Sequence, residues 1–307
     1  MVKKSIIELI GNTPIIELSK IYKGKGKLFA KMEYLNPGGS IKDRPALQII
    51  TDAYKNGTLQ KGQPVVEMTS GNMGAGLAIV CNYFGNPFTA IMSVGNSKER
   101  VKMMEAFGAN VILTPQKTGE PGKVTGEDIE VANIIAKLFA EENNAFFANQ
   151  FYNPSSTKSH FEGTGPEIWN ELENDLNAFI ASVGSAGTFV GTSTYLKSKN
   201  ENIQCIAVEP ENASIIKNGK VKSDKHLLQG TGYGKVPPQW KQNLADEILT
   251  VTDQEASEMK ILLGKLEGLH VGFSAAANVV ATIKYLQKIN KDDCNAVTIL
   301  CDTGFKY

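Results

Sequence analysis

Cysteine and histidine are scarce in this chain, and their scarcity excludes two common kinds of site. The 307 residues include four cysteines and three histidines. No two cysteines form a CxxC pair, and Cys294 and Cys301 lie in or beside a strand-like stretch, so we expect buried free thiols rather than disulfides. The histidines have no metal-ligand spacing, so we expect no metal; they are His160, His226 and His270.

Net charge and long apolar runs are absent as well. The 32 basic residues balance 32 acidic ones, so no global field is expected to attract nucleic acid or an anionic membrane. The first ten residues hold only a short apolar stretch, interrupted by Glu8, which is too short for a signal peptide. No uncharged run approaches the ~20 residues of a membrane span. We therefore expect a cytoplasmic protein that acts on small molecules, without nucleic-acid or membrane partners.

The rest of the composition is that of an ordinary globular protein, and the chain length favours about two domains. Strand patterns alternate with helical patterns, which predicts crossover units, parallel sheets and an α/β fold. A turn followed by a short strand is expected over 11–16, and further strands over 27–32, 64–68, 88–92, 110–113, 145–148, 178–183, 203–208 and 296–300. The expected helices follow Lys42 and Thr188 and also cover 77–83, 98–107, 129–141, 163–172, 256–266 and 275–289.

One stretch, residues 36–44 (NPGGSIKDR), combines a tight turn with a helix start. Two glycines allow the turn, Ser40 is a candidate N-cap, and the following apolar pattern predicts a helix. Lys42 is therefore expected at or inside the first helical turn, where the electropositive helix end disfavours a cation. A lysine that is neutral part of the time can act as nucleophile and general base, although most lysines are simply solvated.

Two further loops connect a buried strand to a helix. The first runs from Gly184 to Gly191 and presents backbone N–H groups and hydroxyls in a geometry that suits a phosphate. It matches neither a Walker loop nor GxGxxG, although Glu209, ~20 residues further on, keeps a dinucleotide interpretation open. The second loop, Thr69 to Gly76, suits a carboxylate. Either loop alone is equally compatible with a tight turn that binds nothing, and Ser274 alone with a simple helix cap.

Taken together, these stretches resemble the family of pyridoxal phosphate (PLP) enzymes that contains cysteine synthase and cystathionine β-synthase. The motifs occur in the family's order and span nearly the whole chain. They are Gly11–Pro14, Asn36–Arg44, Thr69–Asn72, Asn149–Phe151, Asn153–Pro154, Gly163–Trp169, Gly184–Thr188, Glu267–Gly268, Gly272, Ser274 and Asp302–Gly304.

The resemblance implies fold type II, like the tryptophan synthase β chain, with two parallel-sheet α/β domains and the cofactor in the cleft between them. Residues 1–34 and 148–307 would form the larger domain, which binds the phosphate, and residues 35–147 the smaller one. Lys42 would be the Schiff-base lysine, Asn72 would bond the ring hydroxyl, and Ser274 the pyridine nitrogen. The phosphate would lie on Gly184, Ser185, Ala186, Gly187 and Thr188.

The resemblance also implies a substrate site. Thr69, Ser70 and Gln150 would hold the carboxylate of the amino acid, and Met73 stands where the family usually has threonine. That replacement removes a hydroxyl and adds a thioether, so Met73 is the position where we expect substrate preference to be set. Two smaller departures, at Ser185-Ala186 and after Ser274, are compatible with PLP binding.

The implied reaction is β-replacement or β-elimination on a β-substituted amino acid, because a neutral hydroxyl at the ring nitrogen makes a weaker electron sink than a carboxylate does. The first hypothesis is cysteine synthesis from O-acetylserine and sulfide. The second is a cysteine-consuming enzyme that releases hydrogen sulfide and adds water or a second thiol. A nucleotide-binding oxidoreductase is a remote alternative. By resemblance, the protein would be a homodimer.

Overall fold

The chain folds into two compact units, which are described separately. The computed structural model describes residues 2–120, 124–223 and 226–306. The first unit contains the N-terminal residues up to Ile10, Asn36–Ser156 and Lys306, and the second contains Gly11–Leu35 and Thr157–Phe305. The sequence placed residues 1–34 and 148–307 together in the larger domain, whereas the N-terminal residues up to Ile10, residues 148–156 and Lys306 belong to the first unit. Within the described ranges, no helix has both the length and the apolar character that crossing a membrane requires.

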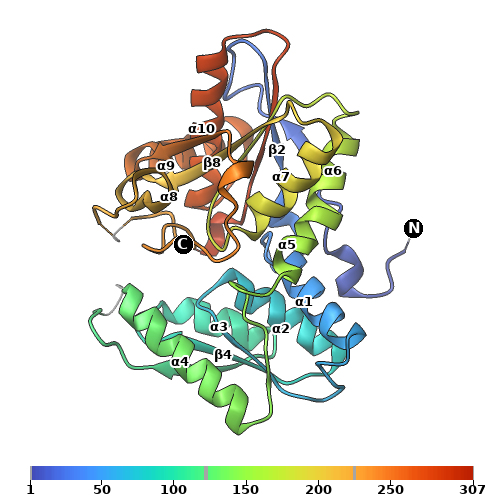
Figure 1. The fold of residues 1–307 in the computed structure, drawn as a ribbon, viewed down its shortest axis with the longest axis vertical. Helices are drawn as coiled ribbons and strands as arrows, with labels where there is room; N and C mark the ends of the chain where they lie inside the picture. Colours follow the sequence, from blue (N-terminus) through green and yellow to red (C-terminus); the bar gives the residue numbers. More distant parts are fainter. Residues whose placement is uncertain (1, 121–123, 224–225, 307) are drawn as a thin grey trace. The chain divides into compact units, whose positions relative to one another are not determined.

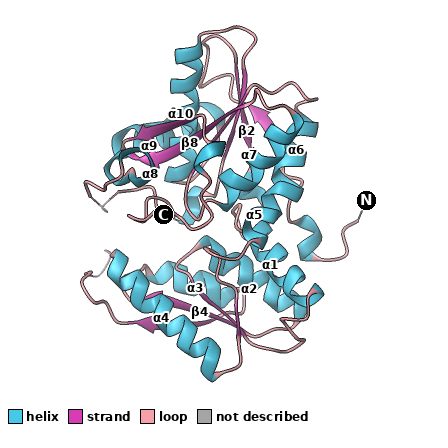
Figure 2. Ribbon diagram, viewed as in Figure 1, coloured by secondary structure: helices cyan, strands magenta, loops and turns pink. Residues whose placement is uncertain are grey.

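The first unit is a parallel sheet covered by helices on both faces (Figures 1 and 2). Its strands lie in the order β5-β4-β3-β6. Apolar side chains alternate between the faces, so Val65 packs with the core under α1 and α2, and Val66 packs under α4. The strands are β3 (Val65–Met68), β4 (Phe88–Ser93), β5 (Asn110–Thr114) and β6 (Phe146–Phe147); the helices are α1 (Asp43–Lys55), α2 (Asn72–Phe84), α3 (Lys98–Ala106) and α4 (Gly126–Glu142).

The second unit is a larger sheet with the order β1-β2-β10-β7-β8-β9, in which only β1 is antiparallel to its neighbour. Its strands are β1 (Ile15–Glu17), β2 (Lys27–Lys31), β7 (Ala178–Ser182), β8 (Gln204–Pro210), β9 (Glu247–Val251) and β10 (Asn295–Ile299). Its helices are α6 (Gly165–Glu171), α7 (Gly187–Lys199), α8 (Ile215–Asn218), α9 (Asp253–Leu262) and α10 (Phe273–Ile289), while α5 (Ser155–Ser159) begins at the boundary between the units.

The core of the second unit follows the same alternation. Ile180 of β7 belongs to the cluster that includes the small buried face of α10, whereas Phe179 points to the other face. There its ring stacks on Phe189 of α7, with the centroids 6.2 Å apart. The four cysteines are free thiols, three of them buried.

Loops that leave the carboxyl ends of three parallel strands carry several of the predicted site residues. β3 leads to Thr69 and Asn72, β6 leads to Gln150, and β7 leads to the turn at Gly184. In parallel α/β sheets, ligands bind at these carboxyl ends. The predicted α/β fold with parallel sheets is confirmed, and these loops lie at the sheet edges where binding is expected.

Candidate active site

Lys42 lies at the N-cap position of α1, where its backbone is in the right-handed helical region. The preceding turn is closed by a hydrogen bond from the Gly39 N–H to the Asn36 carbonyl oxygen, 2.7 Å, and Gly39 has a φ of 71°. Ser40 was expected to cap the helix. Instead its hydroxyl accepts the Lys42 N–H at 3.3 Å, within a further turn, so the helix begins at Asp43.

Two glycines bring this turn close to its neighbours. A Cβ on Gly38 would lie 2.4 Å from Oδ1 of Asp43, and the Gly38 N–H donates to the same carboxylate. A Cβ on Gly76 of α2 would lie 3.1 Å from the carbonyl oxygen of Lys42. A side chain at Gly38 would displace the Asp43 carboxylate, and one at Gly76 would press on the start of α1, so the glycine at position 76 allows the close approach of α1 and α2.

Lys306 connects the Lys42 turn to Asn72. Its Nζ donates to the Gly38 carbonyl oxygen at 2.6 Å and to Oδ1 of Asn72 at 2.7 Å. Because the ammonium group binds the oxygen of the Asn72 amide, it fixes which way the amide group faces. Nothing in the sequence singled out Lys306, since the contact joins residues 234 positions apart in the chain.

The loop from β3 to α2 contains the predicted carboxylate ligands. The Thr69 hydroxyl accepts the backbone N–H groups of Gly71 and Gly74, at 3.4 and 3.0 Å, and so caps the first turn of α2. Its own hydrogen remains as a donor for an anion. The carbonyl oxygen of Ser70 accepts a hydrogen bond from Arg100 at 3.1 Å. This capping explains why α2 begins at Asn72, earlier than the helical pattern indicated.

Met73 is buried, with 3% of its surface exposed, and belongs to the core cluster that contains Leu77 and Met104. The sequence suggested a thioether beside the substrate. The structure places this side chain in the core beneath the loop, because it lies on the first turn of α2 and that helix is apolar on nearly every side. Its influence on the loop would therefore act through packing.

Gln150 follows β6 after a left-handed residue, Asn149, whose φ is 51°. Its carbonyl oxygen accepts the Ser156 hydroxyl at 3.0 Å, and its Nε2 donates to Oε1 of Glu67 at 3.3 Å. Glu67 is 1% exposed, and burial raises its pKa to about 8, although hydrogen bonds from Gln150 and Asn149 act to lower it. Sequence reasoning passed over Glu67, although a carboxylate within a buried apolar strand was the available signal.

In the second unit, the turn from Gly184 leads directly into α7. Ala186 has a φ of 69°, and a Cβ on Gly184 would lie 2.2 Å from the Gly230 carbonyl oxygen, so no larger residue fits there. The N–H groups of the first turn of a helix lack partners within the helix and carry partial positive charge. This turn therefore fits the phosphate group that the sequence assigned to it.

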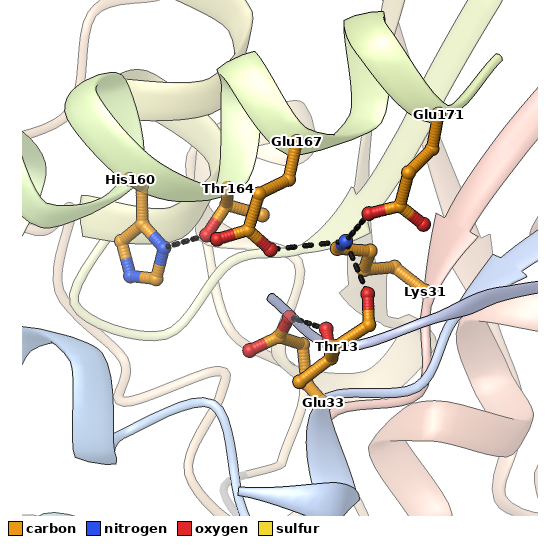
Figure 3. A network of polar contacts seen from close by, with 7 residues as sticks. All are labelled: Thr13, Lys31, Glu33, His160, Thr164, Glu167 and Glu171. Atoms are coloured by element: carbon orange, nitrogen blue, oxygen red, sulfur yellow. Dashed lines mark hydrogen bonds and ion pairs between the residues drawn. The ribbon is translucent and has the colours of Figure 1, made fainter. Parts of the chain in front are cut away.

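The Thr188 hydroxyl lies 3.2 Å from Nε2 of His160, whose Nδ1 lies 2.9 Å from the Thr164 hydroxyl. His160 is buried in the helical segment before α6, and Figure 3 shows its ring directed at Thr164. The sequence gave His160 no role. The structure places it behind the predicted phosphate turn, in position to orient the Thr188 hydroxyl.

The buried cation Lys31 joins two of the motifs noted in the sequence. Its Nζ contacts Glu171, donates to the Thr13 carbonyl oxygen and pairs with Glu167 at 3.0 Å (Figure 3). The Thr13 hydroxyl donates in turn to the buried Glu33 at 2.6 Å. The turn near Thr13 and helix α6 are thus linked through one ion-pair network.

Ser274 lies in the first turn of α10, which is capped by Gly272, so Ser274 is not the N-cap. Its hydroxyl donates to the Gln229 carbonyl oxygen at 3.3 Å. Glu209, the acidic residue of the dinucleotide interpretation, accepts the backbone N–H groups of Ile216 and Lys217, each at 2.9 Å. Both carboxylate oxygens are therefore bonded to the start of α8, which removes the basis for assigning Glu209 to a ribose.

Comparisons with known proteins agree with this arrangement. A family model described as pyridoxal-phosphate dependent enzyme matches residues 6–302. Cysteine synthase B of Campylobacter jejuni is 38% identical over 306 residues, which cover 100% of this chain and 97% of that protein. A cysteine synthase of Staphylococcus aureus is 35% identical, with 99% of this chain and 94% of that protein covered.

Two solved structures are similar over the whole chain. A hydrogen sulfide-producing enzyme from Fusobacterium nucleatum has a TM-score of 0.93 at 33% identity, with 100% of this chain and 98% of that chain covered. An O-acetylserine dependent cystathionine beta-synthase from Helicobacter pylori has a TM-score of 0.91 at 33% identity, with 100% and 97% covered.

Proposed function

Because the chain belongs to the family of pyridoxal-phosphate dependent enzymes, we propose that it makes cysteine from O-acetylserine and sulfide by β-replacement. Its fold is that of the fold type II enzymes in this family, and its cofactor is PLP. The observation that carries the proposal is the match to cysteine synthases along the full chain, at 35 and 38% identity. The position of Lys42 at the start of α1 supports it.

We assign the proton transfers to Lys42. When bound, PLP supplies a carbonyl carbon that bonds to amines and a ring that draws electrons from the substrate Cα. Nζ of Lys42 takes the Cα proton, acetate leaves Cβ with its bonding electrons, and the sulfur of hydrosulfide forms the new bond to Cβ. Nζ then returns the proton to Cα, so the lysine ends as it began.

The other roles follow from the surroundings of each residue. Asn72 would bond the ring hydroxyl through Nδ2, because its Oδ1 accepts from Lys306. The residues from Gly184 to Thr188 would hold the phosphate at the start of α7. Ser274 would meet the pyridine nitrogen as a neutral hydroxyl, which favours loss of a β substituent over transamination. Thr69, Ser70 and Gln150 would hold the substrate carboxylate.

A second function is favoured by one observation, the TM-score of 0.93 to a hydrogen sulfide-producing enzyme. The same residues acting on cysteine would expel hydrosulfide from Cβ and add water or a second thiol. Lys42 would carry out the same proton transfers whether the reaction consumes sulfide or releases it. We place this function second because the curated relatives given above are cysteine synthases.

One paired assay tests the proposal. PLP-saturated protein is given O-acetylserine with sulfide, and in parallel cysteine alone, while sulfide is followed in both. We expect sulfide consumption with cysteine formed in equal amount, at a rate well above that of sulfide release from cysteine. Faster release than consumption would favour the second function, and no reaction in either arm would refute both.

A homodimer in the cytoplasm remains a prediction that rests on the family resemblance. Light scattering on the purified protein tests the first part, because a dimer has twice the chain mass of 33.3 kDa.

A further inference from the structure

Glu67 is a buried carboxylate to which the proposed mechanism gives no role. It lies one residue before the end of β3, on the face of the sheet where Val65 packs with α1 and α2. It is 1% exposed, and no hydrogen-bond partner for its Oε2 lies among the described residues. A buried carboxylate with one unsatisfied oxygen is costly, so its retention calls for an explanation.

The Gln150 side chain binds Glu67 through its amide, which donates to Oε1 at 3.3 Å. β3 and β6 are parallel neighbours in the sheet, so the residues that follow their carboxyl ends meet at one edge. The Ser156 hydroxyl holds the Gln150 backbone, and Glu67 holds its side chain. Together they fix the position of the amide that we assign to the substrate carboxylate.

The charge state of Glu67 matters because the substrate is itself an anion at this point. An ionised Glu67 would place a second negative charge behind the amide and repel the incoming carboxylate, whereas a protonated one would not. Burial, the largest influence, raises the pKa of Glu67 to about 8 against the hydrogen bonds from Gln150 and Asn149, so the acid is mostly neutral near pH 7.

Charged groups nearby do not account for this protonation. β4 and β6 carry no titratable side chains, and α4 covers the opposite face of the sheet. Helices α1, α2 and α3 pack on the Glu67 face. The titratable groups of α1 and α2, with the two lysines of the adjoining turn, are Lys42, Asp43, Arg44, Asp52, Tyr54, Lys55, Cys81, Tyr83 and Lys306, and those of α3 are Lys98, Glu99, Arg100, Lys102 and Glu105. The pKa of Glu67 is set by burial and by its hydrogen bonds, and none of these groups contributes to it.

We propose that Glu67 is a positioning residue for the amino-acid carboxylate: it holds the Gln150 amide, and it must carry its proton for the amino acid to bind tightly. The proposal rests on the proposed function, since that function assigns Gln150 to the substrate. Binding of an amino acid therefore weakens as the pH rises through the titration of Glu67. A ligand without a carboxylate does not show this loss.

The test is calorimetric binding of L-serine to PLP-saturated protein at about pH 7 and about pH 9. An acid that titrates near pH 8 loses about tenfold of its protonated fraction over this range. Glu67→Gln keeps the shape and the acceptor oxygen but cannot ionise. The amine of L-serine also titrates over this range, but it affects both proteins equally and cancels when their affinities are compared. We therefore expect the L-serine affinity of the wild type to fall up to about tenfold more than that of Glu67→Gln.

Two controls separate charge from positioning. Ethanolamine is serine without its carboxylate, and its affinity should change equally with pH in both proteins. Glu67→Leu is apolar and cannot accept from Gln150, so it should bind L-serine more weakly than Glu67→Gln at both pH values. Circular dichroism of each cofactor-free variant establishes that it is folded.

The outcomes are distinct. Equal pH dependence in wild type and Glu67→Gln, with L-serine still bound, would overturn the role of Glu67 and leave the proposed function standing. A difference that ethanolamine shows as well would also overturn it, because the effect would not act on the carboxylate. If wild-type protein with PLP bound no L-serine at either pH, the role of Glu67 and the proposed function would both fail.

Discussion

Replacing Glu67 by glutamine should stabilise the cofactor-free protein, and the gain should grow with pH. The pKa of this carboxyl is about 8 in the folded protein, against an ordinary value of 4.5. Below the ordinary value both states hold the proton and Glu67 has no pH-dependent effect. As the pH rises towards 8, the unfolded chain gives up the proton while the folded protein keeps it, so folding stability falls.

The size of this loss of stability follows from the difference between the folded and unfolded pKa values of Glu67. Each pH unit is worth about 1.4 kcal/mol, so a carboxyl whose pKa is raised from 4.5 to about 8 costs about 5 kcal/mol once the pH exceeds the folded value. Glutamine has no proton to lose. The free energy of unfolding of Glu67→Gln minus that of wild type should therefore grow by about 1.4 kcal/mol per pH unit and level off above about pH 8.

Urea unfolding of both proteins at several pH values between about 5 and 9 measures this difference directly. Glu142→Gln is the matched control, since Glu142 is an exposed carboxylate at the end of α4 and its difference from wild type should stay flat across the range. A difference for Glu67→Gln that is also flat, or that decreases with pH, would show that the buried carboxylate is already ionised and that burial does not raise its pKa.

Three other substitutions test neighbouring contacts. Lys306→Met removes both bonds to Gly38 and Asn72, and should weaken PLP binding about fivefold to tenfold in a fluorescence titration; unchanged affinity would show that the lysine does not orient the amide. His160→Phe removes the partner of the Thr188 hydroxyl, and should weaken PLP but not phosphate-free pyridoxal in the same titration; an equal loss for both ligands would contradict a role at the phosphate. Met73→Thr should cost about 2–3 kcal/mol in urea unfolding, because it opens a cavity and buries a hydroxyl, while Met73→Leu should cost less than about 1.5 kcal/mol; equal costs would contradict the core position.

The regular part of the fold could be predicted because its signals are local. The apolar run that forms β7 and the glycine turn after it lie within about ten residues, and they predict a strand followed by a helix. β9 was missed, since Glu247 and Thr250 interrupt its pattern and the strand is only partly buried beside β8. The helical region near Gly163 begins earlier than expected, at Ser155, because a π-helical segment joins α5 to α6.

The site residues also fall into those with local sequence signals and those without. The positions of Lys42 and of the turn from Gly184 at helix starts could be predicted, because glycines and helix-start signals lie close together in the sequence. Glu67, His160 and Lys306 were missed, since each acts through a contact that only tertiary folding creates. Residues that only position the predicted binding side chains leave little signal in a single sequence.

The central claim is that Lys42 is the lysine that bonds to PLP, and one measurement tests it most directly. Protein incubated with PLP is reduced with borohydride, which makes the link between cofactor and lysine permanent, and its peptides are then analysed by mass spectrometry. We expect a phosphopyridoxyl group on the peptide that contains Lys42. Modification of a different lysine as the main site, or of none, would contradict it.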